Sequence, residues 1–287
     1  MCIRDSHIVA MKEPFGIASG ALADLRLDAE LEILDVGARV DPRDTERAAL
    51  AMKDRGVQVI ITLGGDGTNR TIAKVWPEAT LVPMSTGTNN VFPSLVEPTV
   101  AGAAAGLVAN GFVDIDLAAP RSKMIHLTLA DGSTDVALVD VVTLVDDFVG
   151  NRMPVDPVNL RQLLVSVARP DAIGVSSIAG LHASCEVDKD AAILVRCGDG
   201  GRATNAPIAP GLYRKVPVVD VRRVDLGEEI GLQGPATLAL DGDREHQIPR
   251  GEPVVATVRR DGPRVVNVGV ALSLGASEGI FFSEPLG

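Results

Sequence analysis

The sequence is poor in cysteine, in aromatic residues and in positive charge. Its 287 residues include three cysteines, Cys2, Cys185 and Cys197, which are too few and too scattered for a disulfide framework or a zinc site. Aromatic residues make up 3% of the chain, so the core must consist of Val, Leu, Ile and Ala. The chain has 27 lysines and arginines against 38 aspartates and glutamates, and the resulting charge of -11 argues against a nucleic-acid partner.

Long hydrophobic runs are also missing. No apolar stretch reaches the roughly 18 residues that a membrane helix needs, and the N-terminus lacks the cationic and apolar regions of a signal peptide. We therefore expect a soluble cytoplasmic protein with no membrane partner. The first six residues, MCIRDS, match no element that follows and look like a sequence-assembly scar.

Residues 7–111 alternate between short apolar runs and segments with helical spacing. The clearest helix follows Asp41 as N-cap, has Pro42 at its first position and ends before Gly56. Residues 69–76 are a second, shorter helix between two apolar runs that fit buried strands. This alternation predicts an α/β fold whose N-terminal domain is a Rossmann-like parallel sheet with helices on both faces.

From residue 112 the pattern changes to alternation with a period of two, and Asp131-Gly132 lies between two such runs as a hairpin turn. We expect a β-rich domain over residues 112–262, interrupted by a helix within residues 157–168. Residues 263–287 return to a helical pattern, with Asn267 as cap and Gly279 as stop, and are expected to pack back on the first domain. No flexible linker separates the domains, so a ligand cleft between them is expected.

The stretch GGDGT at residues 64–68 lies between an apolar run and a helical segment, at the carboxyl end of a predicted parallel strand. Gly64 and Gly65 allow the backbone to approach a phosphate closely, and Gly67 permits a positive φ, so that successive N–H groups can bind an anion. Because no Gly-Lys-Ser/Thr follows, this is not a Walker A loop.

Asp66 is the unusual residue of this turn, because a carboxylate repels phosphate. It could be a general base on an attacking hydroxyl or a ligand of Mg²⁺, or it could merely cap the helix that begins near Thr68. A second polar loop follows the next predicted strand and consists of Thr86, Gly87, Thr88, Asn89 and Asn90. Two such loops at one edge of a sheet favour a functional site.

The motifs GGDGT, TGTNN at residues 86–90 and LDGD at residues 240–243 together resemble the superfamily of NAD kinases and of diacylglycerol and sphingosine kinases. The stretch STGTNNVFP is most similar to the acetoin-catabolism protein X branch, on the NAD-kinase side. The resemblance extends from about residue 7 to the end. It implies a two-domain fold, ATP as phosphoryl donor, Mg²⁺ as the metal and a homo-oligomer.

The same resemblance implies roles for individual residues. Asp66 would be the base on the acceptor hydroxyl, and Asp241 and Asp243 would help to hold metal or acceptor, although an Asp-Gly-Asp sequence is also an ordinary hairpin turn. The first loop would line the nucleotide phosphates with Gly64, Gly65, Gly67 and Thr68. The second would contact the nucleotide or the acceptor ribose with Thr86, Thr88, Asn89 and Asn90, and Gly87 would belong to the same cofactor-binding set.

Two features differ from the pattern of the family. An Asn-Pro-type turn that usually precedes the first strand is missing, which suggests a truncated N-terminus. Asn89-Asn90 replaces the Asn-Glu that NAD kinases often place at the acceptor ribose, which leaves the acceptor hydroxyl open.

Other polar residues carry weaker signals. Arg70 and Lys74 lie one turn apart on the helix after GGDGT and could approach phosphates, but a solvated helix face is the more frequent explanation. Three histidines, His126, His182 and His246, lack metal-ligand spacing, and Cys185 and Cys197 have no base partner in sequence. Ser85 has no Gly-x-Ser-x-Gly frame around it.

The function that these patterns favour is ATP-dependent phosphoryl transfer to a hydroxyl, with the ribose of NAD as acceptor. A lipid hydroxyl is the alternative acceptor within the same chemistry, although no basic amphipathic helix is evident in the sequence. An alternative of another class is a nucleotide-binding module without catalysis.

Overall fold

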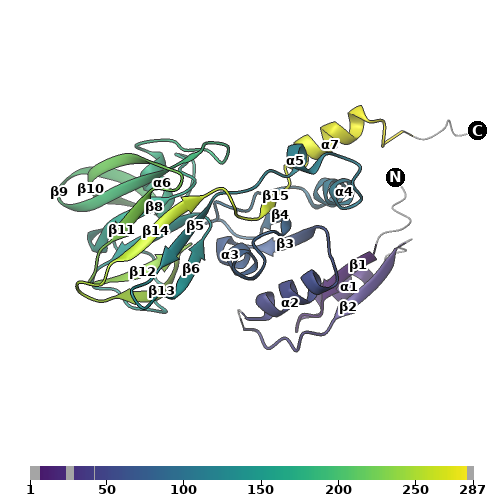
Figure 1. Cartoon of the computed structure of the whole chain (residues 1–287), viewed down its shortest axis with the longest axis horizontal. Coiled ribbons are helices and arrows are strands. Elements are labelled where there is room, and N and C mark those ends of the chain that lie inside the picture. Colours follow the sequence, from purple (N-terminus) through teal and green to yellow (C-terminus); the bar gives the residue numbers. More distant parts are fainter. Residues whose placement is uncertain (1–6, 24–28, 42, 283–287) are drawn as a thin grey trace, which may run out of the picture.

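The computed structural model describes residues 7–23, 29–41 and 43–282. The interpretation of MCIRDS and the place of Pro42 in its helix lie outside the described residues. The chain has two parts with different secondary structure, an α/β domain followed by a β-rich domain (Figure 1). The expected α/β fold class with a parallel N-terminal and an antiparallel C-terminal part is therefore confirmed.

The N-terminal domain alternates strands and helices in the order that the sequence predicts. Its elements are β1 (His7–Met11), α1 (Ile17–Ala23), β2 (Glu30–Leu34), α2 (Arg43–Asp54), β3 (Ile60–Gly64), α3 (Asp66–Val75), β4 (Thr80–Ser85), α4 (Pro98–Ala109) and α5 (Ile115–Ala118). Strands β1 and β2 pair in parallel as a sheet of their own. A second parallel sheet has the order β15-β4-β3, where β15 (Arg264–Val265) returns from near the end of the chain.

The C-terminal part of the chain joins this domain again. Helix α7 (Val268–Ser277) begins after Asn267, whose side chain accepts a hydrogen bond from the Val270 N–H as the sequence predicts. It packs against α4, where Ala271 and Leu107 belong to one apolar cluster. Strands β3 and β4 pair directly in parallel, so their carboxyl ends lie beside each other, with Gly64 opposite Ser85.

The β-rich domain consists of two antiparallel sheets. Six strands have the order β10-β9-β8-β7-β12-β13, and four have the order β11-β14-β5-β6. Their bounds are β5 (Met124–Thr128), β6 (Thr134–Ala137), β7 (Asp140–Leu144), β8 (Leu160–Val165), β9 (Ala191–Ala209), β10 (Leu212–Asp225), β11 (Glu229–Leu232), β12 (Ala236–Leu240), β13 (Asp243–Ile248) and β14 (Val254–Arg259). A short helix, α6 (Val175–Gly180), packs against β9 and β8 and has every residue buried.

The prediction of a helix within residues 157–168 is wrong. A single 3₁₀ turn, η1 (Pro157–Asn159), leads directly into strand β8, which lies between β7 and β9. Leu160, Leu163 and Leu164 are all fully buried, because the sheet is covered on both faces at this strand. A buried strand of this kind has a continuous apolar run, which spacing alone does not distinguish from a helix.

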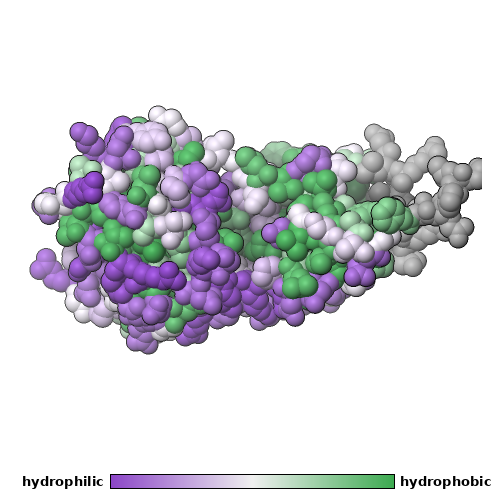
Figure 2. All heavy atoms as spheres, turned by 90° about the horizontal axis from the view of Figure 1, so that it is seen from above, coloured by the Kyte–Doolittle hydropathy of each residue, from purple (hydrophilic) through white to green (hydrophobic). Residues whose placement is uncertain are grey.

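Apolar side chains also reach the surface of the N-terminal domain. From above, Figure 2 shows hydrophobic residues gathering at this end of the molecule, where α5 and α7 lie. Leu117 and Ile115 on α5 are 60% and 39% exposed, and Val270 on α7 is 37% exposed. No helix in the described ranges is long and apolar enough to cross a membrane. The homo-oligomer implied by the family resemblance stays a prediction.

Candidate active site

The glycine turn connects β3 to α3 and leaves the start of the helix open. Gly65 is the N-cap residue, and within the described ranges no side chain accepts a hydrogen bond from the first turn of α3 at this cap. The first N–H groups of a helix have no partners within the helix and carry partial positive charge. The turn therefore offers free N–H donors at the carboxyl end of a parallel strand, which is a favourable place for an anion.

Packing around the glycine turn is closest at Gly64 and Gly65 and less close at Gly67. None of Gly64, Gly65 and Gly67 has a positive φ, contrary to the expectation for Gly67. A Cβ on Gly64 would lie 2.5 Å from Thr68 Oγ1, and one on Gly65 would lie 2.6 Å from Asn90 Oδ1. A Cβ on Gly67 would lie 3.1 Å from Asp243 Oδ2. Side chains from the second polar loop and from the β-rich domain thus press directly on this turn.

Asp66 does not cap the helix but joins the two polar loops. Its Oδ1 accepts hydrogen bonds from the N–H groups of Phe92 (2.8 Å) and Val91 (3.1 Å), and Oδ2 is also 3.1 Å from Val91 N. Val91 and Phe92 directly follow the TGTNN loop. Oδ2 keeps acceptor capacity, because among the described residues its one hydrogen-bond donor, Val91 N, is shared with Oδ1.

Burial and a neighbouring carboxylate change the acidity of this group. Desolvation, and after it the charge of Asp241, raise the pKa of Asp66 to about 7, although the hydrogen bonds from Phe92 and Val91 oppose the shift. A carboxyl group with this pKa is about half ionised at neutral pH. That is the range in which a general base works best.

The second polar loop is arranged around the amide of Asn90. Its Nδ2 donates to Ser85 Oγ at 2.8 Å, and Ser85 Oγ in turn donates to the Gly87 carbonyl at 2.9 Å. Asn90 Oδ1 faces Gly65, and Asn89 Oδ1 faces Gly174 at the start of α6. The structure thus brings the two loops together and adds a third segment from the β-rich domain. Thr86, Gly87, Thr88 and Asn89 are exposed to solvent there.

A cavity of about 130 Å³ adjoins these loops. Thr88, Asn90 and Val91 form one side of it, and residues 169 and 171–173 of the β-rich domain form the other. Val91 also donates to Asp66, so the cavity and the carboxylate share a wall. The glycine turn itself does not line the cavity; a group held there would lie between the TGTNN loop and residues 169–173, with Val91 between it and Asp66.

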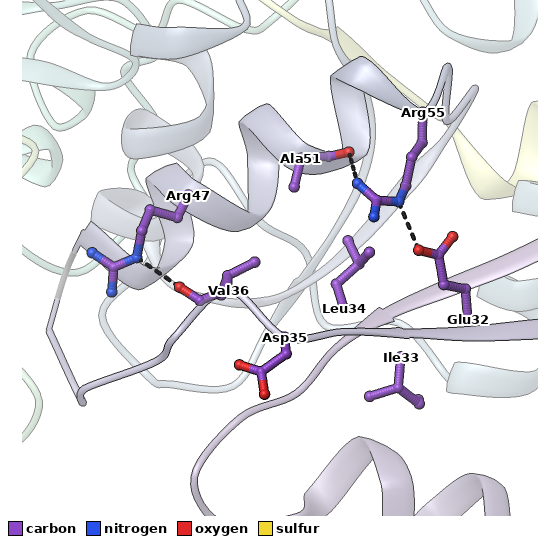
Figure 3. A pocket seen from close by; sticks show the side chains of 8 residues that line it. All are labelled: Glu32, Ile33, Leu34, Asp35, Val36, Arg47, Ala51 and Arg55. Atoms are coloured by element: carbon purple, nitrogen blue, oxygen red, sulfur yellow. Dashed lines mark hydrogen bonds and ion pairs between the residues drawn. The ribbon is translucent and has the colours of Figure 1, made fainter.

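A larger cavity, of about 320 Å³, lies elsewhere, between β2 and α2 (Figure 3). Its two arginines are already engaged: Arg55 Nε is 2.8 Å from Glu32 Oε1, and Arg47 Nε donates to the Val36 carbonyl at 3.0 Å. None of the residues that line it belongs to the glycine turn or to the TGTNN loop. The smaller cavity, which the TGTNN loop lines, is therefore the better candidate for a ligand site.

Comparisons with known proteins agree with this arrangement. The model of the ATP-NAD kinase N-terminal domain matches residues 9–112, and that of the acetoin catabolism protein X C-terminal domain matches residues 123–261. Acetoin catabolism protein X of Cupriavidus necator is 37% identical over 247 residues, which are 83% of this chain and 68% of that protein. The chain belongs to the acetoin catabolism protein X family. The resemblance drawn from the sequence motifs is thereby confirmed.

Solved structures show that this family member has an NAD kinase-like fold. Yeast NADH kinase complexed with NADH has a TM-score of 0.52 at 13% identity, over 97% of this chain and 80% of that chain. An NAD kinase from Archaeoglobus fulgidus in complex with ATP has a TM-score of 0.53 at 14% identity, over 98% of this chain and 100% of that chain. At such identities the likeness establishes the fold alone.

Three aspartates lie close together in this acetoin catabolism protein X relative, two of them half-buried and one buried, and sequence reasoning missed the buried one. Asp140, at the start of β7, is buried beside Asp241 and Asp66, and its Oδ1 has no hydrogen-bond partner among the described residues. Desolvation, followed by the charges of Asp241 and Asp66, raises its pKa well above the usual range. The available signal was a lone carboxylate inside the apolar run VALVDVVTLV.

Asp241 and Asp243 fit a metal site poorly. Both oxygens of Asp241 accept backbone N–H groups, from Leu138 (2.8 Å), Val139 (2.7 Å) and Asp140 (3.0 Å). Asp243 is 62% exposed and lies 3.6 Å from Arg70 Nη2. Across the described part of the chain, no group of three or more His, Cys, Asp or Glu side chains could hold a metal ion. The metal role of this pair stays a prediction that the donor set does not favour.

Helix α3 is docked onto the β-rich domain by ion pairs. Arg70 is 6% exposed and pairs with Glu245, so the expectation of a solvated face is wrong for this residue. Lys74 Nζ lies 2.9 Å from the buried Asp135, whose carboxylate also accepts a hydrogen bond from His246 Nε2 at 2.9 Å. These pairs hold helix α3, and with it the glycine turn, against the β-rich domain, although the buried Arg70 Nε has no hydrogen-bond partner among the described residues.

Asn69 positions the glycine turn, a role that the sequence did not reveal. It is fully buried, its Oδ1 accepts from Thr62 Oγ1 at 2.8 Å, and its Nδ2 donates to the Gly65 carbonyl at 2.8 Å. The amide therefore ties the glycine turn to β3. Its position on the first turn of the helix was visible in sequence, but its burial was not.

The remaining histidines and cysteines have structural partners. His126 pairs with Asp261 at 2.8 Å, and His182 contacts Thr204 Oγ1 at 2.7 Å. Cys185 and Cys197 are buried, and desolvation raises the pKa of the Cys197 thiol to about 11. The burial of both cysteines agrees with the structural thiols that the sequence favours.

Proposed function

We propose that this protein transfers the γ-phosphoryl group of ATP to a ribose hydroxyl of NAD. The observation that carries the proposal is the position of Asp66. Its carboxylate links the GGDGT turn to the residues after TGTNN and has a pKa raised to about 7. Phosphoryl transfer to an alcohol needs a phosphate site and a base side by side.

The open N-terminus of α3 supports the donor half of the proposal. The N–H groups that follow Gly65 have no side-chain cap and would bind the phosphates of ATP. Thr68 and the exposed Thr86 and Thr88 would add hydroxyl contacts. Mg²⁺ would arrive with the triphosphate as part of the substrate, since the described side chains do not form a cage of their own.

In the reaction, Asp66 Oδ2 accepts the proton of the acceptor hydroxyl. The hydroxyl oxygen forms a bond to the γ-phosphorus, and the bond between this phosphorus and the β–γ bridging oxygen breaks, which releases ADP. Helix N–H groups stabilise the charge on the transferred phosphoryl group. Asn90 and Asn69 keep the two loops fixed, so that most of the rate enhancement comes from positioning.

A nucleotide-binding module without catalysis is the second candidate. The observation that favours it is the engagement of both Asp241 oxygens by backbone N–H groups, which leaves the site without a resident metal ligand at that position. Such a module would bind ATP but release no ADP.

The test is ADP release from ATP and Mg²⁺ with NAD as acceptor, with the product isolated and its phosphate position assigned by NMR. The matched variants are Asp66→Asn and Asp54→Asn, the latter at an exposed carboxylate on α2. We expect NAD-dependent ADP release in the wild type and in Asp54→Asn, and its loss in Asp66→Asn. ATP binding without ADP release in the wild type would replace the kinase with the binding module.

A further inference from the structure

The small cavity beside Asp66 has one cationic side chain in its wall. Of its lining residues, Arg169 alone carries positive charge. The two cations of helix α3 do not line this cavity. They pair with carboxylates of the β-rich domain, Arg70 with Glu245 and Lys74 with Asp135. A nucleotide acceptor brings negative charge into a protein whose own formal charge is -11. Arg169 is therefore the group in this cavity that can meet that charge.

The guanidinium of Arg169 is held ready by a neighbouring carboxylate. Its Nε and Nη2 donate to Asp171 Oδ1 and Oδ2 at 3.0 and 2.7 Å, in the paired geometry that an arginine also uses to bind phosphate. The two side chains are 44% and 66% exposed. Ion pairs at such exposed positions contribute little, so a phosphate group can replace the carboxylate.

The stem of the loop is fixed even though its tip is exposed. Ala168 and Cys185 exchange two backbone hydrogen bonds, at 2.9 and 2.8 Å. Gly180 of α6 packs so tightly on the Arg169 backbone that a Cβ there would lie 2.2 Å from the Arg169 carbonyl carbon. The arginine therefore extends from a rigid base toward the cavity. Preorganisation of this kind lowers the entropy that binding costs.

We propose that Arg169 is a specificity-determining residue that binds a phosphate group of the acceptor, and that it restricts the acceptor to hydroxyl compounds with a phosphate close to the reacting hydroxyl. This inference rests on the proposed phosphoryl transfer and identifies its acceptor class. A cavity of about 130 Å³ is small compared with drug-sized ligand pockets, so it would hold one ribose with its phosphate rather than a whole dinucleotide. An uncharged lipid alcohol would leave Arg169 without a new partner.

The test compares two acceptors that differ by one phosphate, nicotinamide mononucleotide and nicotinamide riboside, together with NAD. Affinities are measured by calorimetry on the full chain, with the donor site filled by a non-hydrolysable ATP analogue. In Arg169→Ala we expect the Kd of NAD and of the mononucleotide to rise about tenfold or more, the loss of one charge-assisted contact, with no change for the riboside. Arg169→Lys should restore part of the loss.

Two further variants separate this effect from general damage. Asp171→Asn should tighten the binding of the mononucleotide, because it removes the competing carboxylate. Arg161→Ala, at an exposed arginine of β8 whose guanidinium contacts the carbonyls of Val158 and Leu160, should change none of the affinities.

The inference and the proposed function fail in different ways. Four results would overturn the role of Arg169, whether or not turnover occurs. In Arg169→Ala these are an equal loss of affinity for mononucleotide and riboside, no loss of affinity, or a loss confined to the ATP analogue. The fourth is a wild type that binds the mononucleotide no more tightly than the riboside. The expected pattern of affinities without ADP release would keep the role of Arg169 and overturn the kinase.

Discussion

Two turns of this protein, one in each domain, place an aspartate next to glycine directly after a strand, yet only one of the two carboxylates keeps acceptor capacity. The strand before Asp66, β3, is exposed on one face, whereas β12, before Asp241, is buried throughout. Asp66, after β3, accepts two backbone N–H groups and keeps acceptor capacity on Oδ2. Asp241, after β12, is half-buried, and its two oxygens accept hydrogen bonds from three backbone N–H groups, those of Leu138, Val139 and Asp140. The number of backbone donors that reach a carboxylate, rather than its sequence motif, decides whether it is available for chemistry.

The largest effect is expected at Asp66. Asp66→Asn should lower kcat for ADP formation by about 10²–10⁴-fold, because the amide cannot accept the hydroxyl proton. The urea midpoint should stay unchanged or rise, since the substitution removes a partly buried negative charge beside Asp241. An equal loss of activity and of stability would mean that Asp66 is structural, as Asp241 is.

Asp241→Ala should show the opposite pattern. It removes the acceptor of the Leu138, Val139 and Asp140 N–H groups, and we expect the free energy of unfolding to fall by about 2–4 kcal/mol. Asp243→Ala, two residues along the same turn, is the control; its side chain is exposed and should cost at most about 1 kcal/mol. Chemical denaturation of both variants checks the difference, and equal losses would contradict it.

The glycines of the first turn offer a finer comparison. In Gly64→Ala the new Cβ would lie 2.5 Å from Thr68 Oγ1 and 2.8 Å from Thr68 Cβ, so the turn must move. We expect kcat/KM to fall by about 10²-fold, the effect of a misplacement near 1 Å. In Gly67→Ala the nearest atom is the end of the exposed Asp243 side chain, at 3.1 Å, which can move away. Steady-state kinetics should therefore rank Gly64→Ala well below Gly67→Ala, and the reverse order would refute this description of the turn.

The smallest expected effect concerns the pH dependence of stability. The pKa values of Asp66, Asp140 and Asp241 are all raised, so the folded state binds more protons than the unfolded state above the ordinary value of 3.8. The free energy of unfolding should therefore fall as the pH rises from about 4 toward 7. Asp135 and Asp147, whose pKa values are lowered, act only below this range. Urea midpoints at pH 5, 6 and 7 measure the slope, which should be shallower in Asp66→Asn; an increase with pH would contradict the assignment.

The sequence predicted those parts of the fold whose signals are local. The order of strands and helices through α4 and the Asp131-Gly132 turn between β5 and β6 follow from spacing, caps and turn residues. Strand β8 was taken for a helix, because its identity depends on pairing with β7 and β9 rather than on its own residues. Local patterns do not encode which strands will lie on either side.

The candidate site shows the same limit. The two polar loops were evident from their glycines and from their positions after apolar runs. Asp140 was missed, because nothing around it marks a carboxylate that only the tertiary fold brings next to Asp66 and Asp241. Arg70 was misjudged for the same reason: its partner Glu245 is 175 residues away in sequence.

The pH dependence of kcat/KM for NAD, measured for the wild type and for Asp66→Asn, tests the role of Asp66 most directly. With a pKa of about 7, Asp66 must lose its proton before it can act as a base, so the wild-type value should fall with decreasing pH below about 7. The variant should have a low rate without this acidic limb. A wild-type profile that is flat through pH 7, or a variant that keeps both the rate and the limb, would show that another group accepts the proton.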